Sequence, residues 1–95
     1  MGYWGDIDTW GLRCLARARS NIDHLEALLM SDSVFETHRA AAVVEPVIAG
    51  IDCPSILTSE EQQLYRKLIS ETKGRLEQEF LPVEVVHEAF GRWLA

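Results

Sequence analysis

Apolar residues recur at intervals of three and four along most of this chain, and this periodicity constrains the fold more than any other feature. No segment alternates apolar and polar residues with a period of two over a length that would predict a strand. The periodicity predicts helices over residues 9–30, 33–49, 59–80 and 82–94. The clearest helical face is formed by Leu15, Ala18, Ile22, Leu25 and Leu29.

Capping residues mark several of the expected helix starts. Thr58 and Glu61 form the strongest signal, because the hydroxyl can accept from a backbone N–H in the first turn while the carboxylate reaches back. Ser20 begins a similar pattern, which leaves open a break in the first helix. Pro46 leaves open a kink or a division of the second helix, because proline removes a backbone donor. Residues 50–55 form the clearest expected loop.

The expected fold is all-α. With 95 residues, of which 47% are hydrophobic, the sequence has the size and composition of one soluble globular domain over residues 1–95. Four amphipathic helices with short connections predict a compact four-helix bundle with mostly antiparallel neighbours. The bundle has five helices if Pro46 divides the second one. Residues 1–8 are expected to form an irregular, aromatic N-terminal arm.

Charge and cysteine content bear on partners and compartment. The net charge of −6 disfavours direct binding of nucleic acid and suits a partner with a basic surface. No apolar run approaches the length of a membrane span, and the first residues lack the pattern of a secretory signal. Cys14 and Cys53 lie outside any CxxC pattern, so a cytoplasmic protein with two reduced thiols is expected, with Cys14 buried in a helix.

No group of polar residues in the sequence indicates turnover. The P-loop, GxGxxG, GxSxG and HExxH motifs are missing. Glu84 and His87 have the Glu-x-x-His spacing of di-iron bundles, but such bundles need two of these motifs and this sequence has one. The sequence therefore predicts a protein that is not an enzyme and has no catalytic residue, no metal site and no cofactor. A metal-binding bundle stays as an alternative.

Arg19 and His24 are separated by four residues, Ser20-Asn21-Ile22-Asp23. This spacing resembles the short motif of the HEPN family of helical ribonucleases, and the resemblance covers six residues. It implies an arginine and a histidine one helical turn apart that flank a scissile phosphate at a dimer cleft. Under this alternative the protein is a small helical ribonuclease, and Arg19 and His24 carry the chemistry.

Aromatic and basic residues gather near the N-terminus. Tryptophan, tyrosine and arginine are enriched among the residues that dominate protein–protein binding. We therefore predict an interface formed by Tyr3, Trp4, Trp10, Arg13 and Arg17.

The most favoured function is a non-enzymatic, acidic adaptor or inhibitor that binds a larger protein. Such a partner could be a basic nucleic-acid-binding machine, such as the bacterial defence complexes that phage-encoded inhibitors target. A self-associating structural subunit, and hence a homo-oligomer, is a further alternative. Neither a membrane nor nucleic acid is an expected direct partner.

Overall fold

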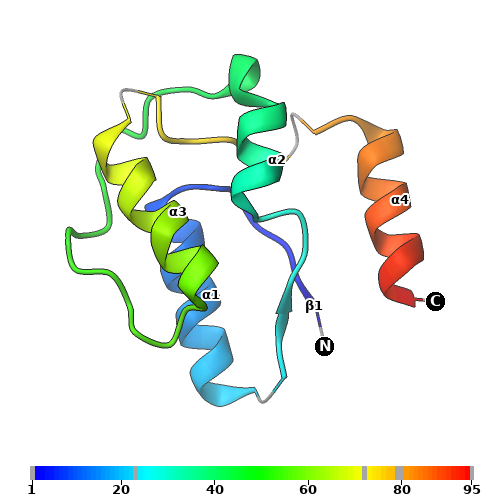
Figure 1. The fold of residues 1–95 in the computed structure, drawn as a ribbon, viewed down its shortest axis with the longest axis horizontal. Helices are drawn as coiled ribbons and strands as arrows, with labels where there is room; N and C mark the ends of the chain where they lie inside the picture. Colours follow the sequence, from blue (N-terminus) through cyan, green and yellow to red (C-terminus); the bar gives the residue numbers. More distant parts are fainter. Residues whose placement is uncertain (1, 23, 72, 79–80, 95) are drawn as a thin grey trace.

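The computed structural model describes residues 2–22, 24–71, 73–78 and 81–94. Figure 1 shows α1 and α3 side by side, with α4 at one edge of the molecule. Helix α3 packs against both α1 and α2. The elements, in chain order, are β1 (Gly2–Tyr3), α1 (Thr9–Asn21), β2 (Glu26–Ala27), α2 (Asp32–Thr37), the 3₁₀ helix η1 (Arg39–Ala41), α3 (Ser59–Ser70) and α4 (Val83–Leu94).

Several short extended segments are joined to one another by backbone pairing, in addition to the helices. Strands β1 and β2 pair in parallel, with Gly2 opposite Glu26, and α1 makes the crossover that parallel pairing requires. Further along the first segment, Ile7 forms an antiparallel bridge with Leu76. Arg75, the residue before Leu76, forms a second antiparallel bridge with Val43. Segments that lie far apart in the sequence are thus joined by backbone hydrogen bonds.

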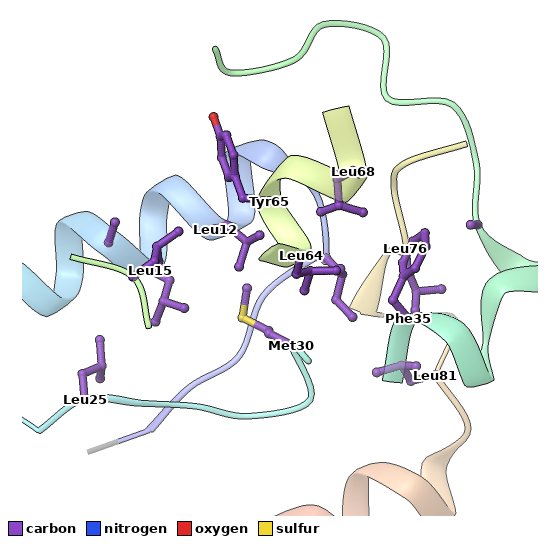
Figure 2. Close-up of a cluster of buried hydrophobic side chains, with 14 residues drawn as sticks. Leu12, Leu15, Leu25, Met30, Phe35, Leu64, Tyr65, Leu68, Leu76 and Leu81 are labelled. Carbon is purple, nitrogen blue, oxygen red and sulfur yellow. The ribbon is translucent and has the colours of Figure 1, made fainter. Parts of the chain in front are cut away.

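The core lies between these extended segments and the helices. Leu12 and Leu15 of α1 face Leu64 and Leu68 of α3 (Figure 2). The extended segments and α2 complete the cluster, which consists of Ile7, Leu12, Leu15, Ala16, Leu25, Met30, Phe35, Ala42, Leu57, Leu64, Tyr65, Leu68, Leu76 and Leu81. Burial of a large apolar side chain contributes roughly 1.5–3 kcal/mol, so this cluster supplies most of the favourable free energy of folding.

Two helix starts follow from local side-chain chemistry. The Asp8 carboxylate caps α1 by accepting a 2.6 Å hydrogen bond from the Gly11 N–H. Thr58 and Glu61 form a reciprocal capping box at the start of α3. Each cap satisfies backbone N–H groups that have no partner within the helix.

The expected four-helix or five-helix bundle is wrong. The described residues form four α-helices, but they also form a parallel two-stranded sheet, and no residue of α4 is buried. The sheet arises at the N-terminal arm, which is not irregular throughout. Gly2–Tyr3 is a strand, and the buried Ile7 pairs with Leu76. Strands this short leave no alternating pattern, so the sequence periodicity could not reveal them.

The first helix ends well before its predicted end at Met30. Asn21 is its last residue, and His24 and Leu29 have φ angles of 58° and 57° in the left-handed region. Pairing with β1 holds residues 26–27 in an extended conformation. Leu25 and Met30 are still buried, but both lie outside any helix. The helical spacing of apolar residues therefore continues into a segment that is not helical, because its backbone pairs with β1 instead.

The second and third predicted helices are also shorter than expected. Only Asp32–Thr37 and the 3₁₀ turn Arg39–Ala41 form in place of 33–49, because Val43 pairs with the backbone of Arg75. The helix predicted over 59–80 ends at Ser70, since the chain must extend at Arg75 to reach that partner. Its predicted residues Thr72, Glu79 and Phe80 lie outside the described residues. No helix in the described part of the chain is long and apolar enough to cross a membrane.

Candidate functional site

Two of the five predicted interface residues, Tyr3 and Trp10, line a common hollow. Trp10 is 52% exposed, and its indole N–H donates to the Val47 carbonyl at 2.8 Å. Trp4 instead packs edge-to-face on Phe90 of α4, with 5.5 Å between ring centroids. The predicted interface is therefore spread over more than one surface of the protein.

The two basic residues of that prediction also differ in their surroundings. Arg13 donates through Nε to the Tyr65 hydroxyl at 2.8 Å and through Nη2 to the Asp52 carbonyl. Its guanidinium therefore ties α1 to α3 and to the loop before α3. Arg17 is exposed on α1. The interface assignment itself stays a prediction.

The candidate catalytic pair Arg19 and His24 is not brought together on one helix. Arg19 forms an ion pair with Glu61 at 2.5 Å and also donates to the Leu25 carbonyl. Because α1 ends at Asn21, the exposed His24 lies beyond the helix. Asp23, between them, lies outside the described residues. The arrangement that the HEPN resemblance implies does not form.

The remaining sequence candidates are dispersed. Glu84 and His87 are exposed on α4. Both cysteines are free thiols, and Cys14 is exposed rather than buried, because it lies on the side of α1 that faces away from the core. Burial raises the pKa of the half-buried Cys53 thiol, which keeps it protonated and unreactive.

Four carboxylates and one guanidinium gather where the first extended segment meets α1. In the antiparallel pairing of Ile7 with Leu76, both of these side chains are buried. Their neighbours in the sequence point to the other face, because successive side chains of an extended segment alternate. This places Asp6 and Asp8 beside Arg75 and Glu77. The fourth carboxylate, Glu45, accepts the Thr9 N–H at 3.1 Å and approaches from the loop after η1.

The two aspartates are oriented in the same way. Asp6 accepts the Gln78 N–H through Oδ1 at 2.9 Å, and Asp8 accepts the Gly11 N–H through Oδ1 at 2.6 Å. The second oxygen of each, Oδ2, faces the Arg75 guanidinium at 3.5 Å and 3.4 Å respectively. Hydrogen bonds from the backbone thus hold both carboxylates so that the Oδ2 atom of each points at the Arg75 guanidinium.

The surroundings of Asp8 disfavour its charged form. Its side chain is 6% exposed, and this burial raises the pKa of the carboxyl group, as do the negative charges of Glu45 and Asp6. The Gly11 N–H and Arg75 oppose the rise without cancelling it. The cluster holds four carboxylates but one guanidinium, which contacts Asp6, Asp8 and Glu77, so the cluster is short of positive charge. Clusters of this kind are found more often at functional sites than elsewhere in proteins.

A hollow of about 350 Å³ opens onto this acidic cluster. Tyr3 lines this hollow, and the pKa of its hydroxyl is raised by burial, by Cys14 and by the two aspartates. Its lining residues are Tyr3, Asp6, Asp8, Trp10, Gly11, Cys14 and Arg75. Among the residues that the structure describes, no group of three or more Asp, Glu, His or Cys side chains is placed so that it could hold a metal ion.

The sequence analysis did not identify this cluster. The available signal is the segment Gly5-Asp6-Ile7-Asp8, in which two acids flank an apolar residue immediately before a helix. Spacing of i and i+2 places two carboxylates on one face of an extended segment. Arg75 and Glu77, which complete the cluster, carry no signal of their own, because only the fold brings them to residue 8.

The profile of the family described as Wadjet protein JetD, C-terminal, matches residues 1–90. The chain belongs to this family. The match covers the acidic cluster, the hollow and most of α4. No curated protein matches the chain with significance. In this member of the JetD C-terminal family, the acidic cluster joins residues of the first extended segment, the start of α1 and the segment around Leu76, and it opens onto a hollow.

Proposed function

We propose that this chain acts within a bacterial defence complex, Wadjet, by holding a divalent cation at Asp6 and Asp8 and binding a nucleic-acid phosphodiester there. The family match supports the assignment to the complex. The cation site is supported by one observation: the Oδ2 atoms of both aspartates converge on one loosely held positive group. The proposal differs from the non-enzymatic protein that the sequence predicts, and that prediction is still untested.

The chemistry of the ligands favours Mg²⁺ or Mn²⁺. These ions prefer carboxylate oxygens, and Mg²⁺ is usually bound by one or two carboxylates with water and substrate phosphates in the other positions. Two converging aspartates therefore suffice for such a site. Ligating carboxylates are normally held by hydrogen bonds from the surrounding protein, as the Gln78 and Gly11 N–H groups hold these.

The residues around the cluster can perform the remaining tasks. A bound cation would neutralise negative charge on a phosphate oxygen. Asp6 and Asp8 would hold this cation. The exposed ring of Trp10 also lines the hollow, and a nucleic-acid base can stack on it there. The net charge of −6 disfavours broad contact with a nucleic-acid backbone, so binding is expected to depend on the cation.

Replacing Asp8 by asparagine is expected to weaken Mn²⁺ binding by about tenfold or more, since a ligand charge is lost. The cap on α1 survives, because asparagine also caps helices well. The raised pKa of Asp8 destabilises the fold at pH values above that pKa, so Asp8→Asn is expected to melt no lower than the original protein at neutral pH. This advantage disappears as the pH falls towards the ordinary aspartate pKa, where Asp8 itself is protonated.

Calorimetric titration of Mn²⁺ into both proteins, with melting followed by circular dichroism, measures these effects. Asp52→Asn is the matched control, since it removes an exposed acidic charge outside the cluster. Equal Mn²⁺ affinity in the original protein, Asp8→Asn and Asp52→Asn would contradict the proposed site. Mn²⁺-dependent nicking of plasmid DNA by the assembled complex, lost in Asp8→Asn, would extend the proposal from binding to cleavage.

A second candidate function is the protein-contact module that the sequence predicts. It is favoured by apolar side chains that are exposed along the loop between η1 and α3, close to Trp10. The most exposed of these are Val44, Val47 and Ile51. Exposed apolar patches of this kind mark contacts with partner proteins. The acidic net charge further suits a partner with a basic surface.

Changing Val47 to glutamate is expected to reduce co-purification with the other Wadjet subunits at least about tenfold, because a charge is buried at the contact. Asp8→Asn serves as the control and is expected to co-purify as the original protein does. Undiminished recovery of Val47→Glu would count against this function. Light scattering of the isolated protein would distinguish binding to another subunit from self-association, because self-association predicts a mass that rises with protein concentration.

A further inference from the structure

Arg75 contacts the acidic cluster without forming a close ion pair with any member. Its Nε lies 3.4 Å from Asp8 Oδ2, and its Nη2 lies 3.5 Å from Asp6 Oδ2 and 3.4 Å from Glu77 Oε1. Charge-assisted hydrogen bonds between such groups normally measure about 2.7–2.9 Å. Three carboxylates therefore attract this guanidinium, and none holds it closely.

Other arginines of this protein show the closer geometry. Arg39 holds Glu71 through two nitrogens at 2.8 Å and 3.0 Å, and Arg19 likewise holds Glu61 through two nitrogens. These arginines link elements of the fold. The contrast indicates that Arg75 neutralises a cluster of charge rather than joining two particular side chains.

One donor of Arg75 is also unused. Its Nε is shielded from solvent and has no hydrogen-bond partner of acceptable geometry among the described residues. A buried donor without a partner disfavours this position of the side chain. Nearly a third of the side chain is nonetheless exposed, and it lines the hollow beside Trp10 and Cys14. The guanidinium can therefore turn into the hollow without crossing the core.

On the basis of the proposed function, we propose that Arg75 is an exchangeable counter-cation of the site. The Arg75 guanidinium neutralises Asp6 and Asp8 when no divalent ion is present. A divalent ion would displace the guanidinium, because the two compete for the same Oδ2 atoms. The released guanidinium then binds the substrate phosphate, whose oxygens its planar pair of N–H groups matches. Arg75 thus opposes binding of the metal and favours binding of the phosphodiester.

These opposite effects make the proposal testable with Arg75→Gln. Its affinity for Mn²⁺ alone is expected to rise about tenfold, because the competing charge is gone, while its affinity for a labelled DNA oligonucleotide in Mn²⁺ falls about tenfold. Calorimetry measures the first and fluorescence polarisation the second. Arg66→Gln, which removes an exposed arginine of α3, is the matched control and is expected to change neither affinity.

Arg75→Lys keeps the test decisive if Arg75→Gln does not fold. Lysine retains the charge but not the planar pair of donors, so Mn²⁺ affinity is expected to stay near the original and DNA affinity to fall. Unchanged DNA affinity in Arg75→Lys would overturn the role of Arg75. If the original protein binds Mn²⁺ and folded Arg75→Gln binds it no more tightly, the role of Arg75 is overturned, while the proposed metal site stands. No Mn²⁺ binding by either protein would overturn both proposals.

Discussion

Alanine at position 11 is expected to destabilise the protein by about 3 kcal/mol or more, the upper range for a forced overpacking. A Cβ atom on Gly11 would clash with the Asp6 carbonyl oxygen and lie 3.1 Å from Asp8 Oδ1. The first of these is a backbone atom beside the Ile7–Leu76 bridge, so it cannot move alone. Relief of the clash requires α1 to move away from the extended segment, which would also disrupt the acidic cluster.

Thermal melting of Gly11→Ala measures this effect, and Gly91→Ala is its matched control. A Cβ on Gly91 meets no atom within 4 Å, and the residue lies within α4. Alanine there is expected to stabilise the protein by about 0.5–1 kcal/mol, because glycine is disfavoured in helices. A melting temperature for Gly11→Ala equal to that of the original protein would show that the helix start has room to adjust.

Replacing Phe35 by alanine is expected to cost about 3–5 kcal/mol of the free energy of unfolding. The side chain is completely buried, at the group of core residues that includes Leu76 and Leu81 (Figure 2). The Arg39 guanidinium carbon lies 5.1 Å from the ring centroid, and this favourable contact is lost as well. Since a domain of this size is stable by about 5–15 kcal/mol in total, the variant is expected to be close to unfolding.

Urea denaturation followed by tryptophan fluorescence gives the free energies for this comparison. Phe35→Leu keeps most of the volume and is expected to lose less than half as much as Phe35→Ala. Near-equal stability of Phe35→Ala and the original protein would mean that the site collapses around the smaller side chain, and that α2 contributes little to the core.

Helix starts were the most predictable part of this fold. Thr58 and Glu61 form the reciprocal cap that their spacing indicates, because a cap depends only on residues within one turn. Helix ends were poorly predicted. Asn21 ends α1 although apolar residues continue at helical spacing beyond it, since the backbone at 26–27 pairs with β1. Periodicity records which side chains are buried, and an extended segment can bury them too.

The acidic cluster was likewise only partly predictable from the sequence. The spacing of Asp6 and Asp8 before a helix was enough to predict that the two carboxylates lie together, and the capping role of Asp8 is local. The position of Arg75 was not predictable, because Arg75 reaches Asp8 only through the antiparallel bridge of Ile7 with Leu76. The likelihood of a contact across so many residues depends on the folding of everything between them.

The amino-acid sequence by itself determined the residues that start α1 and α3 and the acidic net charge, because each depends on composition or on neighbours within a turn. The tertiary structure alone decided where the helices end, that a parallel pair of strands forms, and that three carboxylates of the acidic cluster meet the Arg75 guanidinium. Those outcomes depend on backbone hydrogen bonds between distant segments, whose free energy outweighs the modest helical preference of the residues they extend.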